Sequence, residues 1–268
     1  MIELRNIHFS YSDRPILKNV SFTVGDDEAL VIMGPSGSGK STILRLILGL
    51  ECPQQGELLI DGANVCTMRE KDRRKLRKKI GMVFQAGALF DSLTVGENVG
   101  YYLIEHSQLR HREIFEKVME MLGFVGLDAD EVIDKLPEEL SGGMRRRVAI
   151  GRALLSTDPK IMLYDEPTTG LDPRATEKIL DLIGKLHSEK PIASIMVTHQ
   201  IVDALTMADR FVVIADGELA FDGNREQLHT STNRRVKEFL KPFLTSFADV
   251  ARQHFVTGVD VNEGPSGP

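Results

Sequence analysis

Gly34-Pro35-Ser36-Gly37-Ser38-Gly39-Lys40-Ser41-Thr42 is the stretch of this sequence that decides the fold. The five residues before it, 29–33, are all apolar, and apolar residues recur at helical spacing after it, over 41–50. A buried strand, a glycine-rich loop and a helix, in that order, form the context expected of a Walker A loop. A plain strand-to-helix turn is the alternative, but such a turn needs no Lys-Ser pair.

A Walker A loop binds nucleotide phosphates through its backbone. The glycines let N–H groups close around the phosphates at the helix N-terminus. Lys40 would supply a point charge to the outer phosphates, and the Ser41 hydroxyl would ligate Mg²⁺. The whole stretch from Gly34 to Thr42 is therefore predicted to bind ATP with Mg²⁺.

A second apolar run, Ile161-Met162-Leu163-Tyr164, ends in the adjacent carboxylates Asp165 and Glu166. Because side chains alternate along a strand, the two carboxylates point to opposite sides and can have different roles. Such a pair alone would more often be a helix cap. With the Walker A loop upstream, we expect Asp165 to hold Mg²⁺ through water. Glu166 is then expected to polarise the water that attacks the γ-phosphate.

The order of apolar runs indicates the fold class. Strand-like runs return at 195–197 and 211–214, with a helix-like segment at 175–187, and residues 95–155 are mainly helical. Short strands and turns occupy about the first 30 residues. This pattern predicts an α/β protein with a largely parallel sheet, joined by an antiparallel β subdomain and an inserted helical subdomain.

Leu140-Ser141-Gly142-Gly143-Met144 lies between the two nucleotide motifs. By itself Ser141 fits a plain cap of the helical run that follows it. The segment and its position resemble the signature of the ATP-binding cassette family, whose fold has a RecA-like P-loop NTPase core. The resemblance implies that Ser141, Gly142 and Gly143 face the γ-phosphate held by a second copy of the chain, so that the site is complete only in a dimer.

The same resemblance assigns roles to four further residues. Tyr11 looks like the aromatic residue that stacks on adenine, and Gln85 like the Q-loop glutamine, which ligates Mg²⁺ and senses a transmembrane partner. Asp172 looks like the D-loop aspartate at the dimer interface, and His199 like the switch histidine that contacts the γ-phosphate. Out of this context, Gln85 would be an ordinary polar loop residue and His199 a structural one. The residues predicted to act in catalysis are Lys40, Gln85, Glu166 and His199.

The signature departs from the common family pattern at Met144, where Gln is more frequent, and continues into Arg145-Arg146-Arg147. We expect activity to be retained, because the phosphate-facing groups precede Met144. Together with residues 84–95, this segment is similar to the ATPases of Mla-type and Mce-type lipid transporters. It implies an ATP-hydrolysing subunit that drives lipid, preferably phospholipid, between bacterial membranes through a separate integral-membrane permease docked near 85–95.

Other functions remain open at this point. One alternative is the ATPase of an ABC transporter for another solute. Another is a soluble cassette ATPase acting on DNA or ribosomes, which the net charge of −6 disfavours because no basic field replaces phosphate counterions. A nucleotide switch without transport is a third.

The basic stretch 69–79 is predicted to be a solvated helix face, with contact to acidic lipid headgroups or a partner as the alternative.

Composition and segment boundaries complete the expectations. With 268 residues, 42% of them hydrophobic, the chain can bury a core, and it has no apolar run long enough to span a bilayer. Lacking a leader, it is predicted to be cytoplasmic, on the inner face of the inner membrane, with Cys52 and Cys66 as reduced thiols. Residues 1–228 are predicted to form the nucleotide-binding domain. In the extension 229–268, residues 236–255 would bind the second ATPase subunit or a small regulatory protein, and 262–268 would be disordered or not native.

Overall fold

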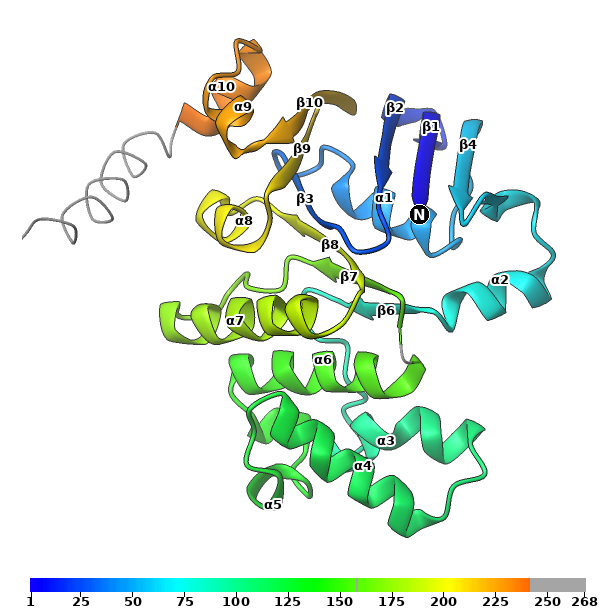
Figure 1. Cartoon of the computed structure of the whole chain (residues 1–268), viewed down its shortest axis with the longest axis vertical. Helices are drawn as coiled ribbons and strands as arrows, with labels where there is room; N and C mark the ends of the chain where they lie inside the picture. The colour runs from blue at the N-terminus through cyan, green and yellow to red at the C-terminus, as the bar shows by residue number, and fades with distance from the viewer. Residues whose placement is uncertain (158, 242–268) are drawn as a thin grey trace, which may run out of the picture.

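A largely parallel sheet forms the centre of the computed structural model, which describes residues 1–157 and 159–241 (Figure 1). Within these residues, six strands lie in the order β10-β9-β3-β8-β7-β6, and only β10 is antiparallel to its neighbour. Strands β3 and β8 are buried on both faces, as parallel strands covered by helices require. The strands are β3 (Ala29–Met33), β6 (Ile80–Val83), β7 (Ile161–Asp165), β8 (Ala193–Thr198), β9 (Arg210–Ala215) and β10 (Glu218–Asn224).

An antiparallel sheet packs beside this core. In the described part of the chain its four strands follow the order β2-β1-β4-β5. Burial alternates along β1, so that Ile2, Leu4, Ile7 and Phe9 face the core that also contains the buried side of helix α1 (Lys40–Ile47). Strand β2 of the hairpin lies against the phosphate-binding loop, since a Cβ atom at Gly39 would be 2.6 Å from the Leu17 side chain. The strands are β1 (Ile2–Tyr11), β2 (Arg14–Val24), β4 (Gln55–Ile60) and β5 (Ala63–Asn64).

A helical subdomain is inserted between β6 and β7, from the start of its first helix at Val95 to the end of its last at Thr157. Its first helix starts with a capping box, in which the Thr94 hydroxyl accepts from the Glu97 N–H and the Glu97 carboxylate accepts from the Thr94 N–H. Figure 1 shows α6 between α7 and the other inserted helices. The inserted helices are α3 (Val95–His106), α4 (His111–Phe124), α5 (Ala129–Val132) and α6 (Gly142–Thr157).

The remaining helices pack against the parallel sheet, with α9 and α10 beside strands β9 and β10 at one edge. They are α2 (Glu70–Arg77), α7 (Pro173–Glu189), α8 (Ile201–Met207), α9 (Arg225–His229) and α10 (Arg234–Leu240), with single 3₁₀ turns at Val65–Thr67 and Pro137–Glu139. Among the helices of the described residues, none has the length and apolar character needed to cross a bilayer. The predicted α/β core, antiparallel β subdomain and helical insertion are all present.

The C-terminal helix α10 is part of the core. Val236 and Leu240 are buried in the same apolar cluster as Leu228, so continuous packing extends past the predicted domain boundary at 228. Residues 242–268 lie outside the described residues. The predictions for residues 242–255 and for the tail 262–268 therefore stay predictions.

The expectation of two reduced thiols is wrong, because Cys52 and Cys66 form a disulfide with their Cα atoms 5.7 Å apart. Strand β4 pairs with β5, and this hairpin brings the loop after α1 next to the 3₁₀ turn Val65–Thr67. The sequence offered no sign of this pairing, since the two cysteines meet only after the chain has reversed direction.

Candidate active site

The loop between β3 and α1 is built by glycine conformations that other residues do not adopt. Gly34 has φ of 148°, and a Cβ atom there would lie 2.0 Å from the Ile214 carbonyl oxygen. Gly39 precedes α1 with φ of 104°, and no side chain caps the first turn of the helix. The first N–H groups of α1 are therefore left for an external acceptor, as at other anion-binding helix N-termini.

Two buried polar side chains, Lys40 and Ser38, lie at this loop. The Lys40 ammonium is buried and donates to the carbonyl oxygens of Gly34 at 2.8 Å and Pro35 at 2.9 Å. Burial lowers the pKa of Lys40, against the charges of Glu166 and Asp165, which raise it. The Ser38 hydroxyl is buried with no hydrogen-bond partner among the described residues. A phosphate would give both groups a charged partner.

Ser41 and Asp165 join α1 to the end of β7. The Ser41 hydroxyl donates to Asp165 Oδ1 at 2.9 Å. Burial raises the pKa of Asp165 in spite of this bond, which acts in the opposite direction. Among the described residues, no group of three or more His, Cys, Asp or Glu side chains forms a metal cage. The two oxygen donors nevertheless fit Mg²⁺, which in phosphate sites takes few protein ligands and completes its shell with water and substrate oxygens.

Glu166 is held in a strained and fully supported position. Its φ is 47°, a left-handed conformation that costs about 1–3 kcal/mol in a residue other than glycine. The Glu166 N–H donates to the Val197 carbonyl at 2.9 Å, and the Thr169 hydroxyl donates to Oε2 at 2.9 Å. His199 Nδ1 lies 3.0 Å from Oε1, which is within hydrogen-bonding distance of this carboxylate oxygen.

The loop after Glu166 is anchored to helix α8. The Thr168 hydroxyl donates to the Asp203 carboxylate, and both side chains are buried. Burial raises the pKa of Asp203, opposed by the Thr168 bond and by His199. Sequence reasoning did not select Thr168, Thr169 or Asp203, since hydroxyl groups and single carboxylates in these positions carry no signal until the strands place them together.

A cavity of about 290 Å³ opens over the phosphate loop. Arg14 and Ile16 of β2 form part of its wall, and neither was a sequence candidate; their nearness to Tyr11 in the same hairpin was the only available signal. Tyr11 is exposed, packs edge-to-face on Phe9 at 4.8 Å, and its hydroxyl accepts from Arg45 at 3.3 Å. Its role in adenine stacking stays a prediction.

Among the described residues that line the cavity over the phosphate loop, none belongs to the signature segment. The Ser141 hydroxyl accepts from the Met144 N–H at 3.2 Å, and Asp172 Oδ1 accepts from the Ala175 N–H at 2.9 Å, so both residues cap helices. A Cβ atom at Gly143 would lie 2.9 Å from the Ala175 Cβ. The signature and the segment containing Asp172 therefore lie against each other, on a surface formed by the starts of α6 and α7.

Gln85 follows β6 at the same edge of the sheet as Asp165, because β6 and β7 are parallel, and it is exposed. Two arginines of α6, the buried Arg146 and the partly buried Arg152, hold the backbone around it. Arg146 donates to the Phe84 carbonyl at 2.5 Å, and Arg152 donates to the Gly87 carbonyl at 3.1 Å. The basic run after the signature thus connects the signature helix to the loop that contains Gln85.

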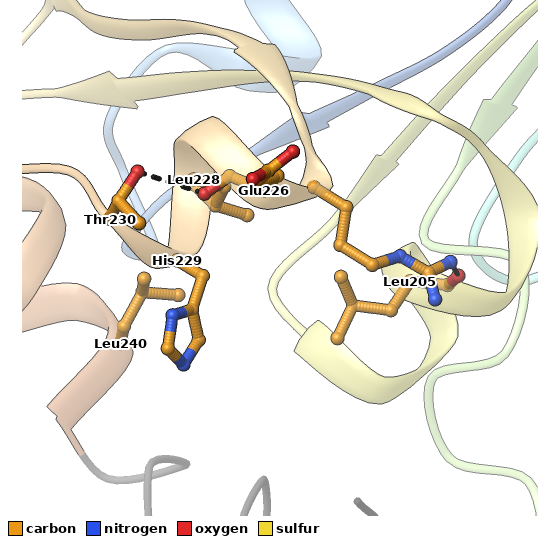
Figure 2. A pocket seen from close by; sticks show the side chains of 7 residues that line it. Leu205, Glu226, Leu228, His229, Thr230 and Leu240 are labelled. Atoms are coloured by element: carbon orange, nitrogen blue, oxygen red, sulfur yellow. Dashed lines mark hydrogen bonds between the residues drawn. The ribbon is translucent and has the colours of Figure 1, made fainter.

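A larger cavity of about 400 Å³ lies between α8, α9 and α10, away from the phosphate loop. Figure 2 shows Leu205 on one side of it and His229 and Leu240 on the other. Its polar groups are largely occupied, since Arg225 donates to the Leu205 carbonyl and the Thr230 hydroxyl donates to the Glu226 carbonyl at 3.0 Å. The groups suited to nucleotide chemistry are therefore those at the phosphate loop.

Comparisons with known proteins agree with this geometry. Residues 17–169 match the family model described as ABC transporter. The intermembrane phospholipid transport system ATP-binding protein MlaF of Haemophilus influenzae is 40% identical, over 90% of each chain. Protein TRIGALACTOSYLDIACYLGLYCEROL 3 of Arabidopsis thaliana chloroplasts is 41% identical, over 89% of this chain and 73% of its own. A dimeric ATP-binding cassette, solved with ADP and Pi, superimposes with a TM-score of 0.76 at 36% identity, covering 84% of this chain and 98% of that one.

Proposed function

Because this chain belongs to the ABC transporter family, we propose that it is the ATP-hydrolysing subunit of a system that moves phospholipid between membranes. The observation that carries the ATPase assignment is the meeting of Lys40, Ser41, Asp165, Glu166 and His199 around one phosphate-sized loop. The lipid assignment is supported by the relative named for intermembrane phospholipid transport, together with Met144 in the signature.

The residues of the loop bind and orient ATP. Backbone N–H groups at the start of α1 and the Lys40 ammonium bind the phosphates, which replace the Gly34 and Pro35 carbonyls as partners of Lys40. Ser41 and Asp165 would hold Mg²⁺, with Gln85 as a further oxygen ligand, and the ion would neutralise charge on the phosphate oxygens. Tyr11 would stack on the adenine.

Glu166 acts on the attacking water. Its carboxylate accepts a hydrogen bond from the water that faces the γ-phosphate and takes up the proton released by the attack. His199 and Thr169 fix the two carboxylate oxygens, so that the side chain does not need to reorganise during the reaction. His199 is also exposed enough, at 41%, for its ring to contact the γ-phosphate.

The site requires a second copy of the chain. Ser141, Gly142 and Gly143 lie beside the segment with Asp172 and do not line the cavity over the phosphate loop of their own chain. Two copies facing each other would place each signature over the partner's nucleotide, as expected for a dimer that closes on ATP and opens after hydrolysis. The isolated chain should accordingly bind ATP and hydrolyse it slowly.

An integral-membrane permease would dock at the Q-loop and α3. Phe84, Phe90 and Tyr101 expose aromatic rings there, and the centroids of Phe90 and Tyr101 are 4.7 Å apart. Clustered exposed aromatic residues are typical of binding surfaces. This partner would hold the chain at the cytoplasmic face of the inner membrane, and co-fractionation with membranes that depends on the permease tests that location.

A variant of Glu166 tests the catalytic assignment. In the complex purified with its membrane partner, Glu166→Gln should lower ATP hydrolysis by about 10²–10⁴-fold, because the amide cannot accept the proton, while ATP binding persists. Glu189→Gln, an exposed change at the end of α7, is the matched control and should hydrolyse ATP at the parental rate. Parental hydrolysis by Glu166→Gln would show that another group is the base.

The transported substrate is tested separately. The complex reconstituted into vesicles with labelled phospholipid should move lipid only when ATP is hydrolysed. Hydrolysis without lipid movement would leave the ATPase assignment intact and favour transport of another solute.

A small regulatory protein, or the second ATPase subunit, would bind the extension after Lys241. Removing residues 242–268 tests this and keeps α10, with the buried Val236 and Leu240, in the chain. Unchanged dimerisation and partner binding would remove both roles from the extension.

A further inference from the structure

Helix α2 and its flanks carry a concentrated positive charge. Residues 69–79 contain eight Lys or Arg residues and two acidic ones, in a chain whose formal net charge is −6. The remainder of the chain is thus strongly acidic. On a protein of net negative charge, such a basic segment creates a local positive electrostatic potential.

The structure separates this charge into a paired side and an unpaired side. Glu70 lies within 3.4 Å of guanidinium nitrogens of Arg73, Arg74 and Arg77, and this ion-pair cluster stiffens the helix. Lys71 and Lys75 are exposed one turn apart, and neither has an ion-pair partner in the part of the chain that the structure describes. These ammonium groups face solvent without compensation.

Helix α2 borders the proposed permease-docking surface. Arg77 donates to the Leu48 carbonyl at 3.1 Å, two residues before Leu50, which is 57% exposed. On the other side, the Lys78 ammonium lies 5.6 Å from the centroid of the Tyr102 ring of α3. Figure 1 shows α2 at the margin of the molecule, between the antiparallel sheet and α3. A membrane partner seated on α3 would therefore bring α2 toward the bilayer.

We propose that the exposed face of α2 binds the anionic phospholipid headgroups of the bilayer, with Lys71 and Lys75 as its principal contacts. The chemistry of the face favours lipid over protein. Protein interfaces are depleted of lysine and built around apolar anchors, whereas this helix has a single apolar residue, Leu76, and buries it. Flexible ammonium groups fit a fluid anionic surface, on which each basic residue strengthens binding about fivefold, equivalent to about 1 kcal/mol.

Nucleic acid is a weaker match for the same face. Sequence-tolerant binding of single strands uses aromatic residues interleaved with the basic ones, and α2 has none. The acidic remainder of the chain would also repel a long polyanion, while a lipid surface needs to meet only one face of the protein.

Vesicle binding by the full chain tests the proposal. Vesicles of phosphatidylcholine and phosphatidylglycerol in equal parts are compared with pure phosphatidylcholine by co-sedimentation at low salt. The full chain should bind the anionic vesicles preferentially, and binding should weaken as salt is raised through the range where the Debye length falls below about 10 Å. The orientation of α2 toward the bilayer rests on the proposed function, because it assumes a permease docked at α3. Vesicle binding by the chain alone does not need the permease, so the lipid-binding proposal and the proposed function can fail independently.

A pair of matched variants gives the decisive comparison. Lys71→Gln with Lys75→Gln should weaken binding to anionic vesicles about 25-fold, from the fivefold contribution of each residue. Lys117→Gln with Lys178→Gln makes the same charge change at exposed positions of α4 and α7, and should change binding less than about twofold. Equal losses in both variants, or no preference for anionic vesicles, would overturn the proposal. So would an α2 variant that binds vesicles normally but no longer co-purifies with the permease, since that result identifies a protein contact.

Discussion

Arg146 provides a test of the link between the signature helix and the Q-loop. Its side chain is 5% exposed, and its guanidinium donates to the Phe84 carbonyl, one residue before Gln85. The shorter side chain in Arg146→Gln cannot reach that carbonyl. A hydrogen bond from a charged group contributes about 1.5–3 kcal/mol. Burial lowers the pKa of Arg146, which shows that its charge is desolvated, so removing the charge returns part of that cost.

The balance of these effects sets the expected size. We expect Arg146→Gln to lower the free energy of unfolding by about 1–2 kcal/mol, or about 2–8 °C in the unfolding temperature of a chain of this length. Permease-stimulated hydrolysis should fall by a larger factor than the basal hydrolysis of the chain alone, because the loosened loop contains Gln85. Calorimetry and ATPase rates with and without the permease measure the two effects.

Arg112→Gln is the matched control for this experiment. Arg112 is 89% exposed and pairs with Glu116 one helical turn away, so its loss should cost less than about 0.5 kcal/mol. If Arg146→Gln unfolds at the parental temperature and keeps the parental ratio of stimulated to basal hydrolysis, the link through Phe84 has no energetic role. If stability falls but the ratio of stimulated to basal hydrolysis is unchanged, Arg146 contributes to packing alone and does not couple the signature helix to the Q-loop.

Three further predictions concern buried charge and the disulfide. Asp165→Asn should weaken Mg²⁺-dependent ATP binding about 10–100-fold by titration calorimetry. Without nucleotide the same variant should be more stable than the parent at neutral pH. Burial raises the pKa of Asp165 in the folded protein, so the ionised carboxylate destabilises the fold at any pH above that pKa. This destabilisation disappears as the pH falls through the folded pKa. Asp203→Ala should lower the unfolding free energy by about 1–3 kcal/mol in urea, since the buried Thr168 hydroxyl loses its acceptor, while Asp203→Asn should cost less. Reductant should remove about 3 kcal/mol from the parent, the chain-entropy value for a loop of this length, and nothing further from Cys52→Ser.

The parts of the site that were predictable are those in which the chemistry depends on adjacent residues. The phosphate loop needs its glycines, Lys40 and Ser41 in one short segment, and Asp165 and Glu166 need only the end of a buried strand. Both features can be predicted from the sequence because the residues that form them are consecutive in the chain. The parallel sheet follows from the same alternation.

The parts that were missed depend on contacts between distant segments. Thr168 and Asp203 are separated by 35 residues and meet only after β8 has been placed beside β7. Strand β10 is only partly buried and contains charged residues, so no apolar alternation marked it. Cys52 and Cys66 meet through the β4–β5 hairpin, which was also not predicted. In each case the sequence around one residue does not indicate which distant residue it contacts.

The capping of α6 is compatible with the proposed role of the same segment in the active site of a second copy of the chain. The Ser141 hydroxyl accepts from the N–H of Met144, and its carbonyl accepts from the N–H of Arg145. The first N–H groups of a helix, here those of Gly142 and Gly143, have no acceptor within the helix. A phosphate from a second chain could therefore accept from these two groups, and from the proton of the Ser141 hydroxyl, without breaking any bond of the cap. The two interpretations of the signature, which appeared to be alternatives in the sequence, are compatible in the structure. Closure of the dimer then costs the association of two surfaces, with no refolding of the signature itself.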